Sequence, residues 1–222
     1  MSTAFAAPRH AALWSLVEPT LAEDTDLAHD AEHVLRVYRW AIRLAADAGV
    51  SPDLAGAAAL VHDLVNIPKE SADRPLGSEL SAAAGAEVLP RAGYGSDEVA
   101  AVVEAVRTCS WSRGRSPTSA LGAVLQDADR LDAIGAVGIA RNFACAQAMA
   151  SRGVSGRFYD PVDPIAQADR PLDDRRNAAD HYRVKLLKLA DTMHTPAARA
   201  EAAKRHAFMV AFLDQLAHEA SS

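Results

Sequence analysis

Two histidines and two aspartates are the residues of this sequence best suited to chemistry. His33 lies in one polar stretch and Asp129 in another, and between them His62 and Asp63 are adjacent at the end of an alanine-rich apolar run. Charged side chains in apolar helices are rarely buried unless they are paired or bind a metal. Neutral imidazoles and carboxylates together suit a borderline or hard divalent cation. The sequence therefore predicts one divalent metal ion, with these ligands: His33, His62, Asp63 and Asp129.

Four protein ligands would leave positions on such an ion open for water and substrate. A divalent ion polarises a phosphoryl oxygen and lowers the pKa of its bound water from ~15.7 towards ~7, so hydrolysis of a phosphate compound is the predicted chemistry. Mn2+ or Mg2+ is the expected ion, with Fe2+, Ni2+, Co2+ or Zn2+ as alternatives. The general acid or base stays open between three residues: Asp132, His29 and Glu70. His29 fits a group that orients a metal ligand and a solvated helix face equally well.

An anionic substrate also needs hydrogen-bond donors, and two predicted loops carry cations. Lys69 and Arg74 follow the His-Asp pair closely, and Arg113 and Arg115 lie in a second basic loop. Arginine forks suit phosphate oxygens, whereas lysine acts as a point charge. Lys69 and Arg74 are predicted to bind substrate. The alternative is that they are solvated charges of an exposed loop. Substrate binding is less favoured for Arg113 and Arg115.

Helical positions add three more candidate substrate residues. Arg36 follows His33 at helical spacing, and His181 and Lys185 lie at i and i+4 in a later helix. Arg36 fits a structural ion pair with Asp132 as well as a substrate contact. Lys185 fits a pocket cation and a surface cation beside His181 equally well.

Hydrophobic periodicity predicts that helices position all of these side chains. Asp26 is the expected N-cap of the helix that carries His33, so His29, His33 and Arg36 should share one face. Ser51-Pro52 should start the helix that ends around His62 to Leu64. No stretch reads as a convincing strand. Helices are expected over about residues 11–21, 26–48, 52–64, 78–92, 96–108, 119–132, 135–150, 177–193 and 196–219, with a long loop over 151–178.

The composition of the chain excludes several classes of protein. The 222 residues carry a net charge of −6, which argues against a surface that binds duplex nucleic acid. Two cysteines without paired spacing suggest no disulfide framework, and the N-terminus makes a poor signal peptide. No apolar run approaches the ~20 residues that span a bilayer, so no membrane partner is expected. We expect a cytoplasmic, all-α protein that folds as a compact single-domain helical bundle over residues 1–222.

The order of the three stretches resembles the HD domain superfamily of metal-dependent phosphohydrolases. A histidine on one helix, a His-Asp pair ending another and an aspartate before Arg-Leu match its motif at His33, His62-Asp63 and Asp129, and the resemblance covers roughly residues 24–210. Further stretches are similar to the bacterial YpgQ-like nucleotide pyrophosphohydrolases. These stretches are residues 29–33, 66–69, 127–136 and 180–187. The resemblance implies an all-helical fold.

Differences from related families limit the number of metal ions and the activities that we expect. Residues 64 to 128 contain no histidine, whereas binuclear HD enzymes carry extra histidines there, so one metal is expected. Val65-Asn66 stands where hydrolases of the guanosine alarmones carry Glu-Asp, which argues against that activity. Cys109-Ser110 replaces the His-Ser of many relatives, which argues against a metal role for Cys109 but not against a place in the substrate pocket.

The activity implied by the resemblance is hydrolysis of nucleoside triphosphates to monophosphate and pyrophosphate. A nucleoside monophosphatase, or another small phosphoester hydrolase, would use the same site and release different products. A non-catalytic sensor would bind metal and nucleotide without turnover. The expected partner is a small phosphorylated molecule, with nucleotides leading, and a homodimer is suggested by analogy alone.

Overall fold

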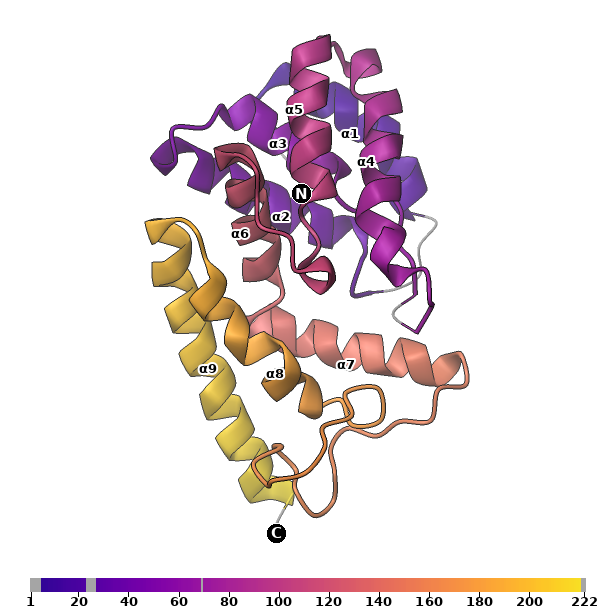
Figure 1. The fold of residues 1–222 in the computed structure, drawn as a ribbon, viewed down its shortest axis with the longest axis vertical. Coiled ribbons are helices and arrows are strands. Elements are labelled where there is room, and N and C mark those ends of the chain that lie inside the picture. Colours follow the sequence, from indigo (N-terminus) through magenta and orange to yellow (C-terminus); the bar gives the residue numbers. More distant parts are fainter. Residues whose placement is uncertain (1–4, 23–26, 69, 221–222) are drawn as a thin grey trace. The chain divides into compact units, whose positions relative to one another are not determined.

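The computed structural model describes residues 5–22, 27–68 and 70–220, and over these ranges the chain is helical with no β-strand, as predicted (Figure 1). One isolated β-bridge joins Arg157 and Asn177. The α-helices are α1 (Pro8–Ala22), α2 (Ala31–Asp47), α3 (Pro52–Val61), α4 (Gly77–Val88), α5 (Ser96–Arg107), α6 (Ala120–Asp132), α7 (Gly135–Ser151), α8 (Asp180–Val184) and α9 (Pro196–Ala220). Short 3-10 helices are η1 (Arg74–Leu76), η2 (Pro90–Ala92), η3 (Trp111–Arg113) and η4 (Leu186–Thr192).

The chain divides into two compact units. One comprises Met1–Thr25 with His29–Asp129, and the other comprises Asp26–Ala28 with Arg130–Ser222. The chain passes from the first to the second within α6. A single domain over the whole length stays a prediction.

Helix α3 is the centre of the first unit. It contacts α1, α2, α4 and α5, and every residue of its segment 55–61 is buried. The segment reads Ala-Gly-Ala-Ala-Ala-Leu-Val, so short side chains allow four helices to approach one axis. At Gly56 an added Cβ would lie 2.4 Å from the His10 ring and 2.9 Å from the Tyr38 ring. The alanine-rich composition is therefore a packing requirement of this unit.

The second unit packs α7 against α9 and places η4 against α8 and α9. Asn142 on α7 donates to the carbonyl of Ala178 (2.9 Å), and Arg205 on α9 donates to the carbonyl of Leu131 (2.7 Å). Gly135 adopts a positive φ of 77° with the Arg205 side chain directly over it. These contacts join the two ends of the unit's sequence.

The long loop before α8 is held within the second unit by one arginine. Arg170 Nη2 donates to Asp180 Oδ1 at 2.6 Å, and Arg170 Nε donates to Asp163 Oδ2 at 2.7 Å. The Asp180 side chain is 1% exposed. Burial opposes ionisation of Asp180, but the bonds from Arg170, the Asp173 N–H and Asn177 outweigh it and hold its pKa below the ordinary value.

Several predicted helix boundaries were wrong. Helix α2 begins at Ala31 with Asp30 as its N-cap, so His29 precedes the helix and does not share its face; the predicted cap, Asp26, lies outside the described residues. The helix expected over 177–193 is interrupted at Lys185, whose φ of −135° and ψ of −60° are not helical. Pro19 lies within α1 without ending it.

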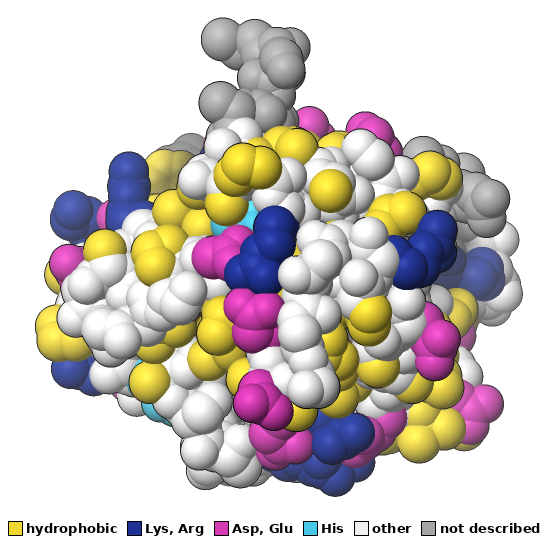
Figure 2. All heavy atoms as spheres, turned by 90° about the horizontal axis from the view of Figure 1, so that it is seen from above, with side chains coloured by type: hydrophobic (Ala, Val, Ile, Leu, Met, Phe, Trp, Pro, Cys, Tyr) yellow, Lys and Arg dark blue, Asp and Glu magenta, His cyan; other side chains and the backbone are white. Residues whose placement is uncertain are grey.

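The surface is of mixed charge where Figure 2 shows it. On that face, Lys and Arg side chains are interspersed with acidic and apolar ones rather than gathered into one basic area. Among the described helices, none has both the length and the apolar character needed to cross a membrane.

Candidate metal centre

His33 is fixed by the start of α2. The Asp30 side chain caps the helix by accepting the His33 backbone N–H at 2.8 Å. An aspartate N-cap accepts one of the backbone N–H groups that have no partner in the first turn of a helix. The cap therefore fixes the backbone position from which the His33 side chain extends. His33 is 1% exposed. Its imidazole is therefore held in the interior of the first unit.

His62 follows α3 as its C-cap residue and is 6% exposed. Its Nδ1 lies 2.7 Å from the carbonyl oxygen of Ala59. A carbonyl can only accept, so Nδ1 donates to it, and the neutral form of the imidazole then presents its lone pair at Nε2. Nε2 is buried, and within the part of the chain that the structure describes it has no hydrogen-bond partner. A buried lone pair of this kind fits a metal ligand.

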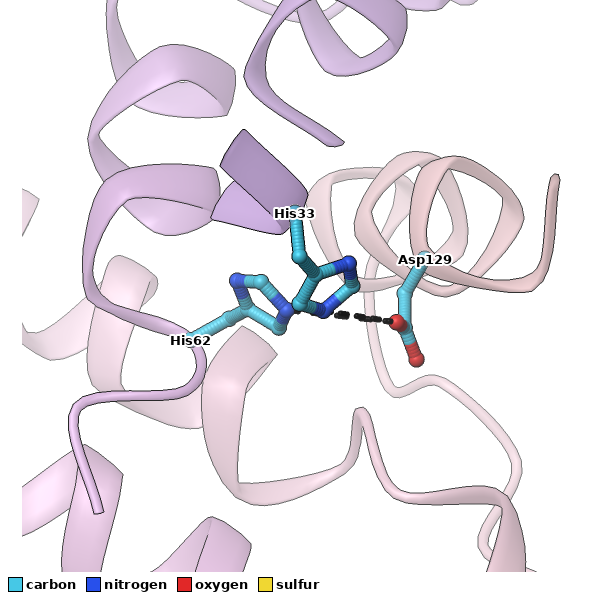
Figure 3. A group of neighbouring side chains, drawn as sticks. All are labelled: His33, His62 and Asp129. Carbon is cyan, nitrogen blue, oxygen red and sulfur yellow. Dashed lines mark ion pairs between the residues drawn. The ribbon is translucent and has the colours of Figure 1, made fainter. Parts of the chain in front are cut away.

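Asp129 on α6 completes a group of three. Its Oδ1 lies 3.7 Å from His33 Nε2 and 3.9 Å from His62 Nε2, and the three side chains point toward one another from three helical elements (Figure 3). These separations are too long for hydrogen bonds but shorter than twice a metal–ligand bond of ~2.1 Å. The candidate ligand atoms all lie within 4.8 Å of one another. This donor set fits a divalent cation.

Asp63 lies beside this group rather than within it. Its Oδ2 is 3.9 Å from His33 Nε2, and its side chain is 20% exposed. Burial opposes ionisation of Asp63, but the three nearby histidines and Arg74 outweigh it, and the pKa of Asp63 lies below its ordinary value. An ionised carboxylate at this position adds negative charge next to the three ligands. Its role as a fourth ligand stays a prediction.

Cys109 lies at the other oxygen of Asp129. Its Sγ is 4.0 Å from Asp129 Oδ2, whereas Oδ1 faces the two histidines. Cys109 is 5% exposed and its thiol is free of any disulfide. Cys109 therefore lies beside the Asp129 carboxylate, and a place for it in the substrate pocket stays a prediction.

Arg74 is the predicted substrate residue whose surroundings are best defined. Its Nη1 donates to Asn66 Oδ1 at 3.1 Å and to the carbonyl of Ile67, so it closes the loop after the His-Asp pair. Its charge also lowers the pKa of Asp63. Lys69 lies outside the described residues, and Arg36 is half-buried on α2, one turn after His33. Substrate contacts for all three stay predictions.

The other predicted residues divide between the units. His29 is buried in the first unit with its ring 6.2 Å from that of His33, which argues against a solvated helix face, and Glu70 lies half-buried in the loop after the His-Asp pair. Asp132 is 1% exposed in the second unit, where Arg141 Nη1 donates to it at 3.0 Å. A buried ion pair gives Asp132 a structural role there. Its part as an acid or base stays a prediction.

His181 and Lys185 also belong to the second unit. His181 Nδ1 lies 2.6 Å from Asp174 Oδ2, and the Lys185 backbone N–H donates to the His181 carbonyl at 2.9 Å. The i and i+4 relation predicted for them is thus present at the backbone. Their contribution to a substrate pocket stays a prediction.

Comparison with known proteins agrees with this geometry. The model of the HD domain matches residues 30–134, which include all four predicted ligands. The protein YpgQ of Bacillus subtilis is 34% identical over 201 residues, covering 89% of this chain and 87% of YpgQ. The chain belongs to the HD domain family.

Solved structures extend the likeness to nearly the whole length of the chain. A Lactobacillus plantarum protein superposes with a TM-score of 0.74 at 32% identity, covering 97% of this chain and 98% of its own. Bacillus subtilis YpgQ in complex with ADP superposes with a TM-score of 0.70 at 32% identity, covering 95% of this chain and 94% of YpgQ. An HD-superfamily hydrolase of Bacillus thuringiensis superposes with a TM-score of 0.70 at 30% identity, covering 96% of this chain and 97% of its own. This chain is accordingly an HD-superfamily hydrolase, a metal-dependent phosphohydrolase in general terms.

The sequence did not reveal one group of charged residues in the first unit. Glu79 on α4 binds Arg107, Arg113 and Arg115, which lie 28 to 36 positions away along the chain. No local spacing connects residues so far apart. The signal available in the sequence was the basic loop itself.

Proposed function

We propose that this HD-family hydrolase cleaves nucleoside triphosphates to nucleoside monophosphate and pyrophosphate. The observation that carries the nucleotide assignment is the complex of Bacillus subtilis YpgQ with ADP, because that protein is 32% identical and matches 95% of this chain. The donor set of His33, His62 and Asp129 supports metal-dependent attack on phosphorus.

The chain's own residues would prepare this reaction as follows. His33, His62, Asp63 and Asp129 would hold one divalent ion, which supplies a Lewis acid and an activated water at neutral pH. The Ala59 carbonyl keeps His62 in the tautomer that presents Nε2 to the ion. Ionised Asp63 offsets part of the ion's charge. Arg74 keeps a fixed positive charge close by, where phosphate oxygens would lie.

Chromatography of reaction products tests the proposal. Manganese-loaded protein is incubated with ribo- and deoxynucleoside tri-, di- and monophosphates, and the products are separated. We expect nucleoside monophosphate and pyrophosphate from the triphosphates. Inorganic phosphate and nucleoside would instead assign a monophosphatase. Nucleotide binding without any product, with metal confirmed in the protein, would assign a sensor.

A further inference from the structure

Three arginines in the first unit surround a single carboxylate. Glu79 Oε1 accepts from Arg113 Nη1 at 2.7 Å and from Arg115 Nη1 at 3.1 Å, and Glu79 Oε2 accepts from Arg107 Nε at 2.9 Å. We call Arg107, Arg113 and Arg115 the arginine triad. One carboxylate cannot neutralise three guanidinium groups. Among the described residues, Glu104 also contacts the triad, through Arg107.

The loop that carries two members of the triad starts at the metal centre. Cys109 Sγ lies 4.0 Å from Asp129 Oδ2, and Arg113 follows four residues later. Gln126 on α6 donates to the carbonyls of Thr108 (2.7 Å) and Arg115 (3.1 Å), which fixes both ends of the loop to the helix that carries Asp129. The basic loop is therefore anchored beside the candidate ligands.

Helix α4 connects the triad to the His-Asp pair from the other side. Ser81 Oγ accepts the backbone N–H of Val65, two residues after Asp63, at 3.1 Å. Glu79 lies in the first turn of the same helix, two residues before Ser81 and about 200° around the axis from it. The backbone of α4 therefore joins the Glu79 cluster to the segment that follows the His-Asp pair.

The triad also keeps donors available for a ligand. In the described part of the chain, Arg113 and Arg115 each use only Nη1 in a hydrogen bond, so Nε and Nη2 remain open. Their side chains are 19% and 39% exposed, and that of Arg107 is 42% exposed. Guanidinium groups bind phosphate oxygens through paired N–H donors. Partly exposed forks with surplus positive charge suit a multiply charged phosphate chain.

We propose that the arginine triad is a binding subsite for the outer phosphates of a polyphosphate substrate. The inference rests on the proposed hydrolysis of nucleoside triphosphates and specifies how the enzyme would prefer triphosphates to monophosphates. Glu79 would act as the internal counterion that orders the arginines until a phosphate chain takes part of their hydrogen bonds. A shorter substrate would reach the metal but not the triad.

Binding of inorganic tripolyphosphate tests the subsite without turnover. Calorimetry is performed on the full chain after metal removal, so that chelation by tripolyphosphate does not contribute. The double variant Arg113→Gln/Arg115→Gln should bind at least ~10-fold more weakly, since charge-assisted hydrogen bonds to phosphate are lost. Its manganese stoichiometry should stay unchanged. Arg91→Gln, an exposed arginine on η2, is the matched control and should bind like the wild type.

Glu79→Gln separates the subsite from a structural role. Removing the counterion should tighten tripolyphosphate binding, whereas a salt-bridge network that only supports the fold would give a lower thermal midpoint and unchanged binding. Unchanged binding in both the double variant and Glu79→Gln overturns the subsite. If the wild type releases no pyrophosphate from nucleotides yet binds tripolyphosphate through the triad, the subsite stands and the proposed function fails. If it releases pyrophosphate while tripolyphosphate binding is independent of the triad, the proposed function stands and the subsite fails.

Discussion

The imidazole of His62 is fixed at one nitrogen and open at the other, and this asymmetry explains the chemistry of the candidate site. Nδ1 donates to the Ala59 carbonyl, so a buried lone pair on Nε2 faces Asp129. Leaving such an atom without a partner costs about 1–3 kcal/mol. A bound divalent ion would remove that cost. The local backbone thus prepares the ligand before the metal arrives.

Asp129→Ala tests the site at the level of one residue. Loss of the carboxylate should abolish turnover of the proposed nucleotide substrates, because the ion loses one ligand and half of the carboxylate charge that the four predicted ligands provide. Far-UV circular dichroism should show the helix content of the wild type. Asp47→Ala, an exposed aspartate at the end of α2, should retain full activity. Full activity in Asp129→Ala would disprove the assignment.

The sequence predicted the residues that come together and missed the details that depend on local geometry. His62 could be found because a polar residue in an apolar helix signals a need for a partner, whereas His33 and Asp129 lie in polar stretches and were found from the order of the motif. The face assigned to His29 was wrong because Asp26 and Asp30 are both good N-caps, and α2 begins at the second. The pairing of Glu79 with Arg113 spans 34 positions, so no periodic pattern could reveal it.

At the scale of the element, the close packing of α3 depends on a position that has no side chain. Its glycine at position 56 receives the His10 ring, whose Nδ1 lies 2.9 Å from the Tyr38 hydroxyl and whose Nε2 lies 2.9 Å from the Asp53 carbonyl. His10 is fully buried. The carbonyl accepts, so Nε2 donates and the Tyr38 hydroxyl donates to Nδ1. A methyl group at position 56 would displace a ring that has little room to move.

Gly56→Ala should therefore destabilise the protein, although alanine favours helices. Overpacking typically costs about 1–3 kcal/mol, which exceeds the ~1 kcal/mol gained in helix propensity. Urea denaturation measures the difference. Gly77→Ala is the control, since the nearest atom to its added Cβ is 3.7 Å away and its φ is −51°. A stabilised Gly56→Ala variant would show that the His10 ring can move at little cost.

The loop before α8 depends on Arg170 and its two carboxylates. Asp180→Asn should lower the free energy of unfolding by about 1.5–3 kcal/mol near pH 7, because the buried side chain loses charge-assisted hydrogen bonds from Arg170 while Asp163 still pairs with that arginine. Asp169→Asn, an exposed residue of the same loop, should have almost no effect. Urea denaturation of both variants checks the expectation.

The effect of Asp180 should also depend on pH in one direction. Its pKa in the folded protein lies below the ordinary value, so the ionised form is favoured by folding. The stabilisation is fully present above the unfolded-state pKa of ~3.9 and is lost as the pH falls through the folded-state pKa. The stability difference between wild type and Asp180→Asn should shrink below about pH 4. A difference that grows on acidification would contradict the pairing.

Helix existence was predictable where apolar periodicity was long, as for α2, α6 and α9, and the long loop over 151–178 was also expected. The break at Lys185 was not, because residues 177–193 carry no glycine or proline to signal it. Tyr182 and Leu189 on either side are fully buried, so tertiary packing rather than local propensity sets the break.

At the scale of the whole molecule, the family assignment gives a metal-dependent phosphohydrolase, and the net charge bears on how an anionic substrate would be held. A net charge of −6 makes a general phosphate-binding surface unfavourable, so recognition of an anionic substrate depends on local cations. Arg74 and the arginine triad are such cations, and both lie in the first unit with the candidate ligands. Substrate selection is thus expected to respond to a few arginines rather than to overall charge.

Counting bound manganese tests the central claim most directly. The wild-type chain and variants are loaded, dialysed and analysed for metal and protein. We predict one ion per chain in the wild type and in His206→Ala, a histidine of α9 in the second unit, and essentially none in His33→Ala or His62→Ala. One retained ion per chain in both ligand variants would contradict a metal centre built from α2, the end of α3 and α6.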